Sequence, residues 1–235
     1  MSKIVTGTTI TKTYVRSRLR QVQAVAGAVF SLFVLLHLSN IATAPFGIDI
    51  FNDYQRLIRR IYQYPLIEIT VVLLPILAHA IAGIWLWLLR RQSPAQKRSW
   101  RARLHTWAGC FLLIFIIGHI LAVRGSSFFF GVFPEFEGLT FSLWYLPAYF
   151  YPYYFLLALA GFYHATHGLR TLAARRGYQL PARLHTGIVI VAAFWFAVSL
   201  LALGGVLVDV PNPVDNDFAR LSAQLLDMDI SKPWK

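Results

Sequence analysis

Long apolar runs separated by short polar segments dominate the chain. Five of them approach or exceed the about 20 residues with which a helix crosses a bilayer. They cover residues 21–44, 66–89, 105–123, 149–172 and 184–208. Backbone groups inside a bilayer must pair within their own segment, so each run is expected to be a helix. The pattern predicts an all-α membrane protein with a single domain over residues 1–235, built as an up-and-down bundle of four helices plus a fifth.

The composition also points to a membrane. Of the 235 residues, 57% are hydrophobic and 14% are charged, whereas soluble domains average about 25% charged residues. Too few polar side chains remain to cover a surface in water. A single cysteine, Cys110, leaves no partner for an internal disulfide. It also excludes an iron–sulfur cluster held by this chain alone and the two-cysteine attachment of a c-type haem.

The basic residues indicate how the helices are oriented. They gather in the N-terminal arm, between the second and third runs, and around the segment between the fourth and fifth: Lys3, Lys12, Arg16, Arg18, Arg20, Arg90, Arg91, Lys97, Arg98, Arg101, Arg103, Arg170, Arg175, Arg176 and Arg183. The positive-inside rule therefore predicts a cytoplasmic N-terminus and an external C-terminus. The net charge of +12 is a topology signal that can also dock anionic lipid or a partner protein, and no nucleic acid is expected.

Two of the predicted outer segments have a character of their own. Residues 50–62 alternate apolar and polar positions, which favours a short amphipathic helix on the outer surface. The arginines of this segment are offset only in part by Asp49 and Asp53. Residues 125–145 are rich in Phe, Trp and Tyr, and such side chains favour the interface between membrane and water.

A histidine recurs at a matching place in each of the first four runs, at His37, His79, His119 and His164. In the first and third runs a glycine precedes the histidine by ten residues, and in the second and fourth a glycine follows it by four. The offset is 82 residues between the first and third histidines and 85 between the second and fourth. The first four runs thus look like an internal repeat, in which one pair of helices occurs twice.

The depth of each histidine predicts how they pair. At 1.5 Å per residue, His37 and His119 fall in the outer half of the bilayer, and His79 and His164 fall in the inner half. Two parallel helices contribute each pair. A haem iron needs two such axial ligands, because the macrocycle fills its other positions. The spacing predicts two b-type haems that carry electrons and leave no open site for a substrate.

The glycines are expected to let the flat macrocycles approach the backbone, Gly27 and Gly109 at the outer haem, Gly83 and Gly168 at the inner one. A zinc site is disfavoured, since two separated pairs supply no set of four ligands.

Other roles for the histidines remain open at this point. A single intramembrane histidine can hydrogen-bond across helices or relay protons. His167 lies one turn from His164 and is an alternative ligand. His105 and His185 lie at the inner ends of their runs, where solvation or contact with haem propionates is expected.

Short motifs at these positions are similar to those of a known family. The first run reads R-L-R-Q-V-Q-A-V-A-G and then F-V-L-L-H-L-S-N, and the fourth reads H-A-T-H-G-L-R-T-L. The chain resembles the single-chain, five-span, two-haem cytochrome b subunit of succinate:quinone oxidoreductases and fumarate reductases. The match falls on His37, Leu38 and Asn40, and it selects His164 over His167 as the ligand. The resemblance covers roughly residues 16–176.

The resemblance implies an electron-transfer subunit that does no carbon chemistry itself. Such a subunit anchors a flavoprotein subunit and an iron–sulfur subunit on the cytoplasmic face of the inner membrane. Electrons pass between succinate or fumarate and a quinone, either menaquinone or ubiquinone. By resemblance, His79 and His164 hold the haem nearer the iron–sulfur subunit, and His37 and His119 hold the distal haem.

The chain departs from the family pattern at two positions. Phe162 stands where some members have a glutamate used for proton movement, and Ala24 stands where the first span has a serine or threonine. Gln23 is the expected substitute for that hydroxyl at a haem propionate. Arg170 and Arg175 are candidates for the propionates of the inner haem, with simple topology anchors as the alternative.

The quinone site and the enzyme class leave alternatives. Candidate hydrogen-bond donors or acceptors for a quinone are Asp53, Arg56, Arg59 and Glu68. A second function is the di-haem cytochrome b subunit of a formate dehydrogenase or hydrogenase, which usually has four spans and a different order of histidines. A third is a haem-free structural or transport protein with proton-relaying histidines.

Overall fold

The computed structural model describes the backbone of residues 2–91 and 97–234 and the side chains of residues 13–91 and 97–234. Over these residues the chain is helical and has no strand. The side chains of Lys3 and Lys12, which entered the predicted orientation, lie outside the described part.

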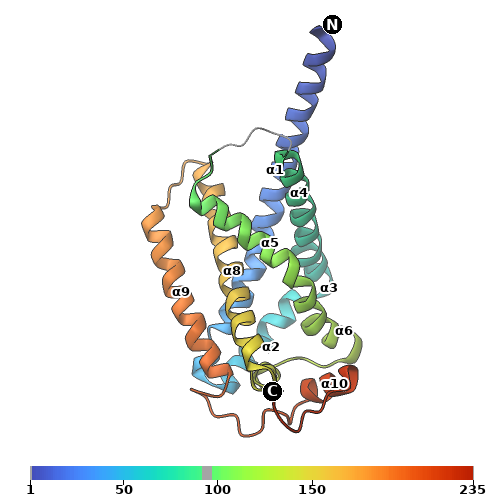
Figure 1. The fold of residues 1–235 in the computed structure, drawn as a ribbon, viewed down its shortest axis with the longest axis vertical. Coiled ribbons are helices and arrows are strands. Elements are labelled where there is room, and N and C mark those ends of the chain that lie inside the picture. Colours follow the sequence, from blue (N-terminus) through green and yellow to red (C-terminus); the bar gives the residue numbers. More distant parts are fainter. Residues whose placement is uncertain (1, 92–96, 235) are drawn as a thin grey trace.

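Five long helices form the body of the molecule (Figure 1). They are α1 (Ser2–Ile41), α4 (Leu74–Arg91), α5 (Trp100–Ile120), α8 (Pro147–Ala174) and α9 (Ala182–Leu203). Short segments extend two of them: α3 (Pro65–Ile67) and the π-helical η2 (Glu68–Leu73) precede α4, and the π-helical η3 (Leu121–Gly125) and α6 (Ser126–Phe130) follow α5. The remaining elements are η1 (Ala44–Phe46), α2 (Ile48–Tyr62), α7 (Phe136–Tyr145) and α10 (Asp217–Leu226).

Helix α8 occupies the centre of the bundle. It packs against α1, α5 and α9, while α1 makes its most extensive contact with α4. The four helices that carry the predicted haem ligands are therefore α1, α4, α5 and α8, with α9 on the far side of α8 (Figure 1). Helix α1 begins at Ser2 and not near residue 21, so its first part projects beyond the other helices (Figure 1).

Four helical segments of the described residues are long and apolar enough to cross a membrane. They are Thr13–Phe46, Pro65–Arg91, Trp100–Phe130 and Ala182–Leu203, which match the first, second, third and fifth predicted runs. Helix α8 matches the fourth run in position, but its histidines and tyrosines make it less apolar than these four segments. The all-α prediction is confirmed, and the molecule has the helices of a multi-pass membrane protein.

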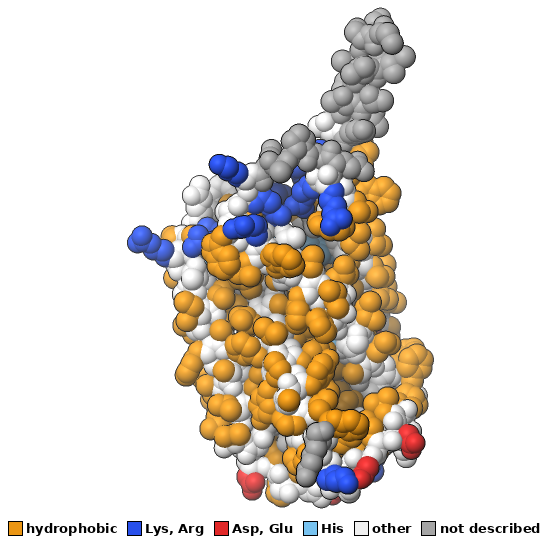
Figure 2. Space-filling model, in the orientation of Figure 1, with side chains coloured by type: hydrophobic (Ala, Val, Ile, Leu, Met, Phe, Trp, Pro, Cys, Tyr) orange, Lys and Arg blue, Asp and Glu red, His pale blue; other side chains and the backbone are white. Residues whose placement is uncertain are grey.

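The surface has the character expected for contact with lipid. Large apolar side chains such as Trp107, Ile114 and Phe194 are 68–72% exposed, and soluble proteins rarely expose broad apolar patches. Figure 2 shows this apolar surface between an end rich in Lys and Arg and an opposite end that carries Asp and Glu. We call the first the basic end; it includes Arg90 and Arg91 at the end of α4 and Arg98 just before α5.

The opposite end is closed by a cap made of α2, α7 and α10. Phe51 of α2 and Phe136 of α7 are fully buried and meet edge to face, with ring centroids 5.4 Å apart. The amide oxygen of Asn52 accepts a hydrogen bond from the backbone N–H of Phe136 at 2.9 Å. Its Nδ2 donates to Glu137 at 3.2 Å. Helix α2 is amphipathic and buries one face, as the sequence predicted for residues 50–62.

The arginines of α2 pair with a local carboxylate, Asp53, and with a distant one, Glu135, which the local sequence does not reveal. Arg56 pairs with Glu135 at 2.9 Å and with Asp53 at 2.7 Å, and Arg59 pairs with Glu135 at 3.3 Å. The hydrogen bond that Arg56 donates to Asp53 and the negative charge of Glu135 raise the pKa of Arg56. The basic character of this segment is thus neutralised across the cap.

Residues 125–145 were expected to lie at the membrane interface, and only their first part fits this description. Phe128, Phe129 and Phe130 are more than half exposed. The following helix α7 is instead mostly buried, because α2, α8 and α9 pack on one side of it and α10 covers Phe141 and Tyr145 on another. The sequence showed the aromatic content but not the covering helix, which comes from more than 70 residues later in the chain.

Removal of the Asn52 side chain tests the cap. We expect Asn52→Ala to leave the buried N–H of Phe136 unpaired, which costs about 1–3 kcal/mol and lowers the unfolding midpoint in detergent by roughly 2–10 °C. The control is Gln224→Ala, which truncates an exposed side chain of α10. Equal midpoints for the two variants would contradict this role of Asn52.

Candidate functional site

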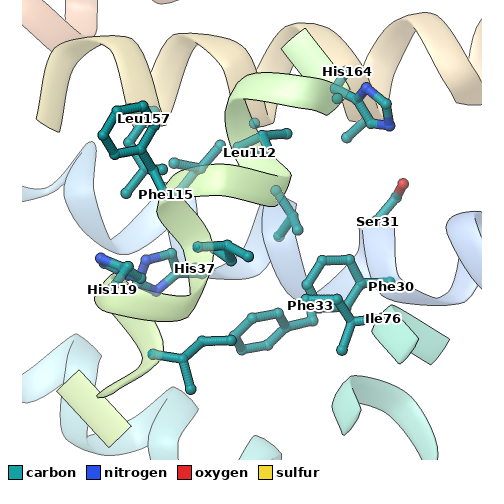
Figure 3. Close-up of a pocket in the computed structure, with 18 of the residues that line it drawn as sticks. Phe30, Ser31, Phe33, His37, Ile76, Leu112, Phe115, His119, Leu157 and His164 are labelled. Carbon is teal, nitrogen blue, oxygen red and sulfur yellow. The ribbon is translucent and has the colours of Figure 1, made fainter. Parts of the chain in front are cut away.

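A large cavity runs through the bundle between α1, α4, α5 and α8. Its volume is about 1590 Å³, more than the about 300–1,000 Å³ of an ordinary ligand pocket. The lining is mainly apolar and includes His37, His79, His119 and His164. Figure 3 shows His37 and His119 together, with His164 farther along the cavity. The space suits more than one large apolar ligand.

One histidine pair lies toward the cap. The rings of His37 and His119 have centroids 5.9 Å apart and planes inclined by 68°. The ring of Phe33 stacks on His37 at 5.9 Å, and Phe115 and Leu157 line the same cavity (Figure 3). We call this the capped-end pair.

A second pair lies toward the basic end. The rings of His79 and His164 have centroids 5.8 Å apart and are nearly perpendicular, at 88°. The structure thus brings together the same partners that depth along the helices predicted. His164 rather than His167 faces His79. We call this the basic-end pair.

Both rings of the basic-end pair are anchored to backbone carbonyls. Nδ1 of His79 lies 2.8 Å from the carbonyl oxygen of Gln23, and Nδ1 of His164 lies 3.1 Å from that of His105. A carbonyl oxygen only accepts hydrogen bonds, so each Nδ1 carries the proton and each Nε2 keeps its lone pair. Histidines that ligate a metal show this arrangement in general.

Two glycines allow these close approaches. A Cβ built on Gly27 would lie 2.5 Å from Nδ1 of His79, and one on Gly109 would lie 2.8 Å from Cε1 of His164. The spacing along the sequence predicts both glycines at the outer haem. That assignment is wrong, because side chains from α4 and α8 reach across to α1 and α5 at the level of the basic-end pair.

The same glycines give the spacing of the two pairs. His37 follows Gly27 by ten residues on α1, and His119 follows Gly109 by ten on α5. At 1.5 Å per residue, the pairs lie about 15 Å apart along the helices. Because α1 and α5 give the same spacing, the capped-end pair and the basic-end pair lie at two levels that are equally far apart on both helices.

The geometry of each pair fits a metal bound by two opposed imidazoles. A metal–imidazole bond of about 2.0–2.1 Å on each side places the ring centres roughly 6 Å apart. Within the described residues, no group of three or more His, Cys, Asp or Glu side chains is placed to hold a metal ion by itself. A metal held here needs further ligands from the bound group, and a haem macrocycle supplies four.

Cationic and polar side chains line the cavity where it approaches the basic end. They are Arg20, Gln23, Arg90, Arg98, Thr106 and Arg175. Arg98 donates a hydrogen bond to the Thr106 hydroxyl at 3.0 Å. Among the candidates for haem propionates, Gln23 and Arg175 line the cavity. Arg170 does not, and its Nε donates to the carbonyl of Leu180 at 2.9 Å.

Nothing in the sequence distinguishes Arg20, Arg90 and Arg98 from the other basic residues as candidates for this role. All three had been counted as topology signals, and their position in basic segments gives no sign of which side chains turn inward. Only the packing of α1, α4 and α5 decides this.

The opposite end of the cavity has a different chemistry. Glu68 forms an ion pair with Arg124 through both carboxylate oxygens. Both residues line the cavity beside Tyr62. The amide oxygens of Asn40 and Gln55 are buried here without a hydrogen-bond partner. Among the quinone candidates only Glu68 reaches the cavity, because Asp53, Arg56 and Arg59 belong to the ion pairs of the cap.

The remaining histidines cluster beside the basic-end pair. His105 lies 4.9 Å from His167, and His167 lies 5.8 Å from His185, measured between ring centroids. His185 was expected to be solvated or to contact a propionate. It is instead 2% exposed, and its Nε2 lies 3.1 Å from the Thr166 hydroxyl. Packing of α9 on α8 covers it.

Neither the family models, the curated proteins nor the solved structures with which the chain was compared match it.

The close approach at Gly27 can be tested by a single methyl group. We expect Gly27→Ala to collide with His79 and to destabilise the fold by about 1–3 kcal/mol. Gly118→Ala is the matched control, since nothing lies within 4 Å of its Cβ and alanine favours a helix over glycine by about 0.8–1.0 kcal/mol. Unfolding midpoints in detergent should therefore move in opposite directions. A stabilising Gly27→Ala would contradict the contact.

Proposed function

We propose that the chain is the two-haem cytochrome b membrane anchor of a succinate:quinone oxidoreductase or fumarate reductase. The observation that carries this proposal is the pair of facing histidine couples in one apolar cavity, about 15 Å apart, with the basic-end rings anchored through Nδ1. Such a pair of haems is a conductor of single electrons through the bundle.

We infer that α8 is the fourth of five membrane-spanning helices. It lies among α1, α5 and α9, all of which have membrane-spanning character. Its polar histidines and tyrosines therefore lie among other helices, where intramembrane polar groups are tolerated. The positive-inside rule then gives a cytoplasmic basic end, with the N-terminus on that side and the C-terminus outside.

The residues of this chain have distinct roles in the proposal. The Nε2 atoms of His79 and His164 face the proximal haem, and those of His37 and His119 face the distal one. Arg175 and the other arginines of the cavity would neutralise propionates of the proximal haem, and Gln23 would donate a hydrogen bond to them, since carboxylates buried at a membrane edge need charged or hydrogen-bonding partners. The apolar lining excludes water from both.

The two ends of the cavity meet different partners. The basic end faces the iron–sulfur subunit and, beyond it, the flavoprotein subunit on the cytoplasmic side, where its charge also attracts anionic lipid. At the capped end, Glu68, Arg124 and Tyr62 offer acceptors and donors to a quinone or quinol. This division gives electrons an entrance and an exit on opposite sides of the inner membrane.

Haem content and ligation test the proposal directly. The purified chain should contain two b-type haems in its dithionite-reduced spectrum. We expect His119→Ala to lose the distal haem alone and His79→Ala to lose the proximal one alone, with each ratio of haem to protein falling from two to one. His185→Gln is the control and should retain both. A chain without haem refutes the proposal, as does a variant spectrum that assigns the four histidines to other pairs.

Identification of the bound partners separates the enzyme classes. A complex isolated through this chain should contain flavin and iron–sulfur clusters and should reduce quinone with succinate, or reduce fumarate with quinol. Formate or hydrogen oxidation by the isolated complex would assign the chain to the alternative class of di-haem subunits.

Exchange of Glu68 tests the quinone end. Glu68→Gln removes the charge that pairs with Arg124, and a hydrogen bond to a charged group contributes about 1.5–3 kcal/mol. We expect quinone-linked electron transfer in the complex to fall about tenfold or more, with both haems retained. Asp53→Asn is the control, because this exposed carboxylate lies outside the cavity. Equal rates for the two variants would place the quinone elsewhere.

A further inference from the structure

His105 contacts the ring of His164 in two ways. Its backbone carbonyl accepts the hydrogen bond from Nδ1 of His164. Its imidazole also stacks on that ring, with centroids 4.1 Å apart and planes inclined by only 9°. The ring of His164 is therefore fixed both at one nitrogen and over one face.

Other rings support His105 from behind. His167 lies 4.9 Å away at an inclination of 38°, and is itself held by Tyr163 at 5.5 Å and by His185 at 5.8 Å. His167 and His185 are 8% and 2% exposed. A Cβ on Gly168 would come within 3.7 Å of His105, so a larger residue there would crowd the ring. This column of rings leaves His164 little freedom to rotate.

The other ligand of the pair lacks such a column. In the repeat of 82 residues, the position equivalent to His105 is Gln23. Each residue precedes a glycine by four positions and offers its carbonyl to a ligand histidine. Gln23 has no ring to stack on His79. The hydrogen bond to a backbone carbonyl thus occurs in both copies of the internal repeat, whereas the stacked ring occurs only in the copy that contains His105.

The orientation of the two ligand rings bears on the haem they hold. The plane of each axial imidazole decides which iron d orbital its π electrons meet. When the two imidazole planes are perpendicular, each interacts with a different one of two iron d orbitals, and these two orbitals keep similar energies. When the planes are parallel, both imidazoles interact with the same d orbital, and the two orbital energies move apart. The surroundings of the ligands also tune the reduction potential of a haem. The angle of 88° between His79 and His164 is therefore a functional quantity.

We propose that His105 is a positioning residue, which holds the plane of His164 at a right angle to His79 by stacking and so sets the electronic state of the proximal haem. This inference rests on the proposed function, because it needs a haem between the two rings. The backbone carbonyl of residue 105 is kept in any substitution. A change of side chain therefore tests the stacked ring apart from the hydrogen bond.

The experiment compares His105→Leu, which removes the ring, with His105→Phe, which keeps a flat ring but no nitrogen. Both are purified as the full chain and examined by electron paramagnetic resonance and by redox titration of the haems. Wild-type protein should give the large-g low-spin signal of perpendicular imidazoles at the proximal haem. In His105→Leu this signal should move to lower g and the proximal potential should shift, with the distal haem unchanged. His105→Phe should restore the wild-type signal.

Trp107→Leu is the control for loss of a ring from the same helix, because Trp107 is 72% exposed on the lipid-facing side. It should leave both signals unchanged. Loss of the proximal haem from His105→Leu but not from His105→Phe also supports the stacked ring. An unchanged signal in His105→Leu overturns the inference, and so does equal loss in both variants. Wild-type protein without haem overturns the proposed function and this inference with it. Two haems whose signals and potentials do not change when His105 is replaced overturn the inference alone.

Discussion

Imidazole rings in the interior of an apolar bundle impose the constraint on which the other features depend. Each ring has two polar nitrogens, and an apolar environment offers no water to form hydrogen bonds with them. At the basic end, the nearest backbone carbonyls of α1 and α5 satisfy one nitrogen of His79 and of His164. The glycine one turn later is what lets each ring approach. The other nitrogen is left to face the cavity, which is why the site suits a metal-containing ligand.

The two ends of the cavity are built for different environments. At the basic end, arginines from α1 and α4, from the residue that follows α8 and from the chain before α5 converge on the opening. At the other end, α2, α7 and α10 cover the bundle, and buried amides and one ion pair replace the cluster of cations. A ligand with an apolar body and an anionic edge fits the first end, and a neutral ligand with hydrogen-bonding oxygens fits the second. The two ends of the cavity therefore suit different ligands.

The internal repeat explains the regular part of this arrangement, and departures from it explain the rest. Both halves place a carbonyl, a glycine and then a histidine along one helix, so the layers come out parallel. The halves differ in what surrounds the ligands. Residue 23 is a glutamine and residue 105 is a histidine, which joins two further histidines in a column of rings. A duplicated scaffold can thus hold two similar ligands in unlike surroundings.

The sequence by itself determined the helical architecture, the segments of membrane-spanning character, the amphipathic helix α2 and the position of each histidine along its helix. These follow from local periodicity and from the fixed rise of a helix. The tertiary structure alone decided that Gly27 and Gly109 serve the basic-end pair, that Arg98 and not Arg170 turns toward the cavity, and that α10 buries α7. It also decided that His105 stacks on His164. Each of these depends on which faces of distant helices meet, and a rotation of one helix by a fraction of a turn changes the contact without changing the pattern of the sequence.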